Sequence, residues 1–220
     1  MRRTLTILIT SILPAASILC FGGCSSSAKE SDKTAAQIFA DAKTATSSLR
    51  SAHVVGRFSG VALQSIDVVV GQSVGGGSVA VGGQQISIFA DQNSVYMKAT
   101  PSAWLALSKD PKIGRLGGHW AIFPSGSAFY AQFGINSIQK LVDNTLNQDP
   151  KTLTKGPTTT VLGQKAIELH SPQGMIFVAA KGPPYLLGLQ GGGAVAFTQF
   201  NTAAVPTAPQ GAVPATDLLK

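Results

Sequence analysis

Apolar and polar residues alternate along the chain from His53 to Lys98. Apolar residues recur there at every second position, which is the period of a β-strand and not of a helix. Gly75–Gly77, Gly82–Gly83 and Gln92–Asn93 separate the runs and supply residues that tight hairpin turns need. We therefore predict an antiparallel meander with one face in water and one apolar face. The apolar set is Val54, Phe58, Ile66, Val68, Val70, Val79, Val81, Ile86, Ile88, Val95 and Met97.

Two segments flanking the meander have the 3/4 spacing of amphipathic helices. Ser31 or Asp32 is the expected N-cap of the first, and Asn136 of the second. The apolar positions are Ala36, Ile38, Phe39, Ala42, Ala45 and Leu49 in the first helix, and Ile138, Leu141, Val142 and Leu146 in the second. Because the first helix leads directly into the meander, we expect its apolar stripe to lie across the apolar face of the sheet.

The pattern becomes strand-like again after the second helix. Five segments, 158–162, 165–170, 175–180, 185–190 and 194–200, are separated by Gly- and Pro-containing turns. The Pro- and Ala-rich tail, 205–220, is expected as an edge strand or a loose end. These elements predict an α+β fold: a curved antiparallel β-sheet of nine to eleven strands, with helices packed over the concave face. Residues 34–220 then form one domain.

The N-terminus reads as an export signal. Residues 1–23 combine Arg2 and Arg3 with a short apolar run, as a signal peptide does. Cys24, after Gly22 and Gly23, resembles the lipobox cysteine of a bacterial lipoprotein, although Phe21 stands where an aliphatic residue is usual. This implies lipidation of Cys24 with acyl chains such as palmitate, and a lipid anchor on the extracytoplasmic side of the cell membrane. A plain cleaved signal and an uncleaved anchor are the alternatives.

The composition supports an exported, tethered domain. Residues 25–220 contain no cysteine, so no disulfide stabilises the domain, and 24–33 read as a Ser-rich flexible tether. Without residues 1–23 the chain keeps 15 basic and 10 acidic residues, a net charge of +5. The charges are scattered, with Lys109, Lys112 and Arg115 as the one local group. This argues against nucleic acid, and an anionic membrane surface or merely a soluble surface fits better.

Residues that carry chemistry are sparse. His53, His119 and His170 lie in or beside different strand-like segments, with no Cys, Asp or Glu at ligand spacing, so no metal site is expected. The acidic residues form no close pair, and the chain has no nucleophile elbow, Walker loop or dinucleotide fingerprint. We therefore expect neither an enzyme nor a cofactor. Short helices over a large concave sheet can leave an apolar cavity, or they can fill it completely.

Several local motifs resemble the LolA-like fold, and more closely the actinobacterial LppX/LprG-type lipoproteins. They are 48–54 (SLRSAHV), 94–98 (SVYMK) with Trp104, 118–120 (GHW), 161–166 (VLGQKA), 181–187 (KGPPYLL) and 197–200 (FTQF). Their order and spacing extend the resemblance over most of residues 34–217. It implies a half-barrel that holds lipid acyl chains and serves lipid or lipoprotein transport across the cell envelope.

The predicted function is thus a cell-envelope lipoprotein that binds acyl chains in an apolar cavity and carries them between membranes. The alternative is a non-enzymatic sensory or protein-binding lipoprotein with a filled core, whose partner is an envelope transporter or another protein. Trp104, Trp120 and Tyr185 are candidates for the cavity mouth or, alternatively, ordinary core aromatics. The candidate cavity lining is Ile38, Phe39, Val68, Val70, Ile86, Ile88, Val95, Met97, Ile138, Leu141, Val142 and Val178.

Overall fold

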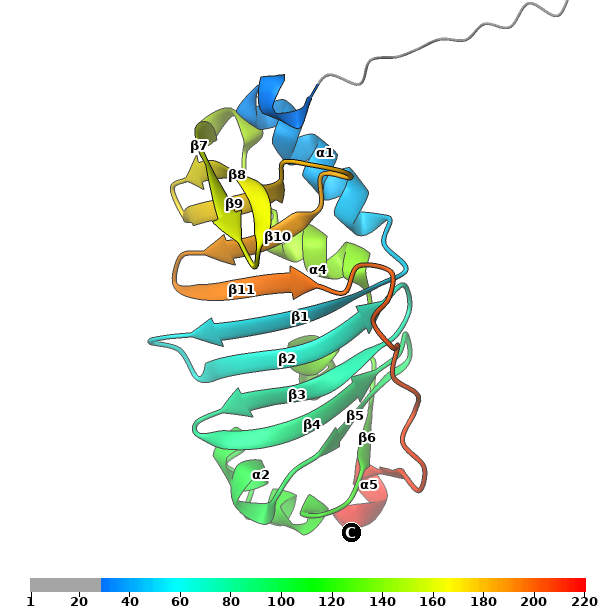
Figure 1. Ribbon diagram of the computed structural model, residues 1–220. Coiled ribbons are helices and arrows are strands. Elements are labelled where there is room, and N and C mark those ends of the chain that lie inside the picture. The colour runs from blue at the N-terminus through cyan, green and yellow to red at the C-terminus, as the bar shows by residue number, and fades with distance from the viewer. Residues whose placement is uncertain (1–28) are drawn as a thin grey trace, which may run out of the picture.

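The computed structural model describes residues 29–220, so the predicted signal peptide, Cys24 and the start of the predicted tether lie outside the described residues. One curved sheet of twelve strands forms its framework, in the order β12-β6-β5-β4-β3-β2-β1-β11-β10-β9-β8-β7 (Figure 1). The strands are β1 (Ser51–Phe58), β2 (Leu63–Gly71), β3 (Gly75–Val81), β4 (Gln84–Ala90), β5 (Ser94–Lys98), β6 (Ala121–Pro124), β7 (Thr154–Val161), β8 (Gln164–Ser171), β9 (Gly174–Ala179), β10 (Leu186–Gln190), β11 (Gly193–Thr198) and β12 (Val213–Pro214).

Helices cover the concave face at both ends of this sheet. Figure 1 shows α1 and α4 beside the β7–β11 half, and α2 and α5 at the opposite end near β4–β6. The helices are η1 (Glu30–Asp32), α1 (Ala35–Ser47), α2 (Pro101–Leu107), η2 (Pro111–Leu116), α3 (Ala128–Phe133), α4 (Ile138–Thr145), η3 (Pro150–Thr152) and α5 (Ala215–Leu218). This confirms the predicted α+β half-barrel with helices over its concave face. None of the helices in residues 29–220 is both long and apolar enough to cross a membrane.

The predicted meander is confirmed as β1–β5, whose members are neighbours in the sheet. Its apolar set faces the concave side and lies in one continuous hydrophobic core, with Phe58 half-buried at its edge. Arg57, Asp67 and Lys98, on the opposite parity, are exposed. The sheet has one strand more than the predicted maximum because the tail adds β12. This short edge strand pairs parallel with β6, whereas all other neighbouring strands of the sheet pair antiparallel.

The predicted turn at Gly75–Gly77 is wrong. These glycines begin β3, and the turn lies before them, where the N–H of Gly71 donates to the carbonyl of Val74 at 2.8 Å. Gly75 lies against the backbone carbonyl of Ile135, which leaves no room for a Cβ atom. Gly75 therefore permits a close approach of the α3–α4 connection to the sheet.

Both predicted N-caps are displaced. Thr34 caps α1, its hydroxyl accepts the N–H of Gln37 at 3.3 Å, and the Gln37 side chain completes a capping box. Ser137, and not Asn136, caps α4. Asn136 is instead buried, and its side-chain amide donates to the carbonyl of Asp91 at 2.6 Å. Because a long-range partner satisfies this amide, the neighbouring serine takes the capping role.

Candidate functional site

The candidate lining residues lie in the core between the sheet and the helices. Eleven of the twelve are buried in one continuous cluster, and Leu141 is half-buried and packs against it. Five hollows on the surface of residues 29–220 are open to solvent, and none of the twelve contributes to their linings. In this structure the helices therefore pack directly onto the concave face.

The three mouth candidates lie in different surroundings. Trp104 is fully buried, with ring centroids 5.7 Å from Phe123 and 5.8 Å from Phe129, so it packs as a core aromatic. Trp120 and Tyr185 are half-buried. Tyr185 packs against Phe200 with 4.8 Å between the centroids of the two tilted rings. The structure therefore does not gather these rings at one mouth.

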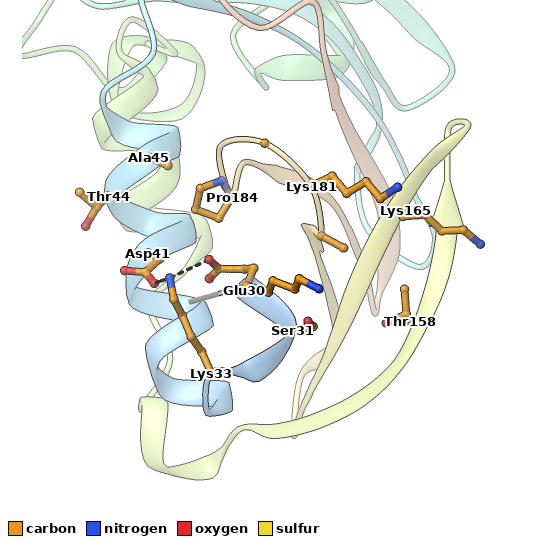
Figure 2. Close-up of a pocket in the computed structure, with 13 residues that line it drawn as sticks. Glu30, Ser31, Lys33, Asp41, Thr44, Ala45, Thr158, Lys165, Lys181 and Pro184 are labelled. Atoms are coloured by element: carbon orange, nitrogen blue, oxygen red, sulfur yellow. Dashed lines mark hydrogen bonds and ion pairs between the residues drawn. The ribbon is translucent and has the colours of Figure 1, made fainter. Parts of the chain in front are cut away.

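A hollow with a volume of about 920 Å³ lies at the β7–β10 end of the sheet. Figure 2 shows η1 and α1 forming one wall, and strands β7 and β8 with the β9–β10 connection forming the other. This hollow is open to solvent. Its lining is Lys29, Glu30, Ser31, Lys33, Asp41, Thr44, Ala45, Thr158, Lys165, Ala180, Lys181, Gly182 and Pro184.

Strand parity places the second wall on the concave face. Lys165 lies two residues before Ile167 in β8, and Ala180 lies two residues after Val178 of β9. Side chains two apart share a face of a strand, and Ile167 and Val178 belong to the core. The hollow therefore continues the apolar concave face beyond the part that α1 covers.

Ion pairs and hydrogen bonds hold the first wall in place. Lys33 Nζ contacts Asp41 Oδ2 at 2.6 Å and Glu30 Oε2 at 2.8 Å, which joins η1 to α1 (Figure 2). Hydrogen bonds to Asp41, and then to Glu30, raise the pKa of Lys33 above its ordinary value of 10.5. Lys155 Nζ donates to the carbonyls of Ser31 and Lys33, which ties η1 to β7. Glu30–Lys33, predicted as the end of a flexible tether, are thus packed onto the sheet.

The lining is positively charged. Its two acidic residues, Glu30 and Asp41, both pair with Lys33. No ion pair within residues 29–220 involves the other three lysines of the lining, which are Lys29, Lys165 and Lys181. The hollow therefore combines small apolar surfaces with unmatched positive charge.

Sequence reasoning missed this hollow. Its walls come from segments more than 100 residues apart, and no local motif joins them. The sequence does contain one indication of the hollow. Lys165 lies on the same face of β8 as the core residues Ile167 and Leu169. A charged residue at the end of an apolar face marks the place where that face reaches solvent.

The histidines do not gather. His53 pairs with Asp67 at 2.7 Å and His170 pairs with Glu168 at 3.1 Å, on separate strands. Within residues 29–220 no group of three or more His, Cys, Asp or Glu side chains could hold a metal ion.

The comparisons with known proteins bear on the fold. No protein-family model matches the chain, and no curated protein matches it in sequence. LprF and LppX are among the solved structures that are similar to it. LprF from Mycobacterium bovis gives a TM-score of 0.54 at 14% identity, over 79% of this chain and 96% of that one. The Mycobacterium tuberculosis lipoprotein LppX gives 0.50 at 15% identity, over 77% of this chain and 96% of that one. The chain thus has the fold of these proteins, which confirms the LppX/LprG-type fold expected from the sequence.

Proposed function

We propose that this protein is a non-enzymatic lipoprotein of the cell envelope that binds the acyl chains of a lipid and carries them between membranes or envelope layers. The supporting observation is the hollow of about 920 Å³ at the open end of the concave face. Its volume lies near the upper end of the roughly 300–1,000 Å³ of small-molecule sites. The shared fold with LprF and LppX supports the same proposal.

The acyl chain enters beside Ala45 and Ala180, where the side chains of the two walls of the hollow are small and apolar. Ala180 shares its strand face with Val178, so the inner end of the hollow meets the core. An acyl chain longer than the hollow parts α1 from the sheet and contacts the candidate lining residues, beginning with Val178. The packed core is the unloaded state in this account.

The energetics favour carriage without catalysis. Burying a 16-carbon chain gains on the order of 12 kcal/mol before ordering costs. A bilayer offers a similar gain, so transfer between membrane and protein is close to balanced in free energy. A carrier therefore needs a dry site and an opening near the bilayer, and no reactive group.

The N-terminal anchor places that opening near a membrane. Lys29, which lines the hollow, is five residues after Cys24, the proposed site of lipidation. Five residues span at most about 18 Å. A lipid-anchored Cys24 thus keeps the hollow close to the surface from which lipid is taken.

Native mass spectrometry of residues 28–220 tests this proposal, since this segment holds every strand, helix and core residue described above. We expect a stoichiometric added mass that organic extraction identifies as lipid. A mass equal to that of the bare chain, unchanged after incubation with envelope lipids, would contradict the proposal.

One observation favours a second function. The twelve candidate lining residues belong to, or pack against, one continuous core cluster, as expected for a sensory or protein-binding lipoprotein with a filled core. In that case the exposed group Lys109, Lys112 and Arg115 on and beside η2 is the candidate contact surface. A protein partner lost when these three residues are replaced, together with a lipid-free chain, would support this function.

A further inference from the structure

The hollow carries unmatched positive charge that the binding of an acyl chain does not use. We propose that the hollow binds the phosphate ester of an anionic lipid head group through Lys165 and Lys181. This inference rests on the proposed lipid-binding function and names the class of lipid.

The backbones of the two lysines lie close together although they come from different segments. The N–H of Ala180 donates to the carbonyl of Lys165 at 2.9 Å, so Lys181 lies beside the β8 backbone at Lys165. Both side chains are exposed, and Figure 2 shows both on the wall opposite α1. Thr158 adds a hydroxyl on the same wall, since it pairs with Ile167 in the sheet. Two ammonium groups and a hydroxyl suit a phosphate ester, which offers several acceptor oxygens.

Lys33 is unavailable for this role. Its ammonium already holds Asp41 and Glu30, and the side chain of Glu30 is 10% exposed. The second carboxylate oxygen, Oε1, is buried without a hydrogen-bond partner among the described residues. Glu30 therefore depends on Lys33, and a ligand that captured Lys33 would leave a buried carboxylate unpaired. The anion is held on the opposite wall.

The charge lies next to an apolar surface, which selects an amphiphile over a simple anion. Lys165 continues the inward face of Ile167, and Lys181 directly follows Ala180. A phosphate at the lysines places its attached acyl chains at Ala45 and Ala180, toward the core. Lys29, on the η1 side, adds a third cation at the rim.

Calorimetric titrations of residues 28–220 test the proposal with three probes. They are dioctanoyl phosphatidylglycerol, dioctanoyl phosphatidylcholine with the same chains but no net charge, and inorganic phosphate. We expect the anionic lipid to bind about tenfold or more tightly than the zwitterionic one at low salt, since each nearby lysine favours an anionic lipid. Added salt should reduce this ratio.

Matched variants locate the effect. Lys165→Gln/Lys181→Gln should bring the ratio close to one and keep the binding of phosphatidylcholine. Lys109→Gln/Lys112→Gln removes the same charge from an exposed site at the other end of the sheet and should leave the ratio unchanged.

The remaining outcomes each overturn the proposal in a different way. If both lipids bind equally, or if the ratio of their affinities is unchanged in Lys165→Gln/Lys181→Gln, the head-group site is contradicted but acyl-chain binding is not. Binding of inorganic phosphate as tight as that of phosphatidylglycerol makes the ligand a free phosphate. Failure of both lipids to bind removes the proposed function and this inference together.

Discussion

The hydroxyl of Thr46 accepts the backbone N–H of Leu186 at 2.9 Å, and both residues are fully buried. This hydrogen bond joins the last turn of α1 to the first residue of β10, 140 positions away in the chain. The β9–β10 pairing shifts register directly after Leu186. The Thr46 side chain thus fixes α1 to the sheet beside the hollow.

Thr46→Val should therefore lower the free energy of unfolding by about 1–3 kcal/mol, because the N–H of Leu186 loses its partner in a buried place. Thr46→Ser keeps the hydroxyl and should cost less. Urea denaturation of both variants measures the difference. Equal stability of the two variants would show that the hydrogen bond contributes nothing.

Gly75→Ala should destabilise the protein by about 1–3 kcal/mol or more, since the new methyl group meets the carbonyl of Ile135. Gly126→Ala is the matched control. A Cβ at Gly126 meets nothing within 4 Å, and that glycine has no positive φ. The control should be neutral or slightly stabilising. Thermal melts of both variants measure the change in stability. An unchanged melting temperature in Gly75→Ala would contradict the close approach of Ile135 to Gly75.

Lys33→Met should lower the melting temperature, because Glu30 and Asp41 lose their shared cation. The pKa of Lys33 is raised in the folded protein, so its contribution is complete below pH 10.5 and is lost as pH rises through the higher folded value. The difference in melting temperature between wild type and Lys33→Met should thus be constant from neutral pH to about pH 10 and shrink as the pH rises above 10.5.

Lys220→Met is the control for this prediction, since it removes a lysine from the exposed pair with Asp217. It should leave the melting temperature nearly unchanged. A Lys33→Met variant that melts like Lys220→Met at neutral pH would show that η1 is not held by this cluster.

Local pattern was sufficient for the meander. Val68, Ile88 and Met97 lie on the every-second-position apolar pattern, which fixes the buried face of a strand wherever one face meets a core. The same logic located the strands after residue 158. The first residues of β7 were missed because Pro157 and Gly156 read as a break, although an edge strand tolerates both.

The local sequence pattern was insufficient wherever a contact with a distant segment determines the role of a residue. Asn136 has the residue type of an N-cap, yet a carbonyl at Asp91 takes its amide. Gly75 has the residue type of a turn, yet it lies within β3, where the backbone of Ile135 from the α3–α4 connection packs against it. Such competition between local and long-range partners cannot be read from spacing alone.

The hollow depends wholly on long-range placement. Glu30 and Lys33 read as part of a flexible tether, and Lys155 of β7 holds their backbone against the sheet. The residues predicted to line a cavity follow from inward parity, which identifies a concave face but not how closely the helices fill it. Only the arrangement of α1 against β8–β10 shows where that filling ends.

The most direct test of the lipid-binding account fills the hollow with a side chain. Ala45 is half-buried on α1 and lines the hollow, so Ala45→Trp occupies the space proposed for the acyl chain. Val70 and Ile88 are less suitable positions, because a tryptophan there would overpack a closed core. Ala106→Trp, on an exposed position of α2, is the matched control.

The measurement is the amount of lipid bound per chain, by native mass spectrometry after incubation with envelope lipids. The account predicts a stoichiometric lipid in wild type and in Ala106→Trp, and less than about half of it in Ala45→Trp, which should still melt cooperatively. The same stoichiometry in all three proteins would contradict the assignment of the hollow as the lipid site.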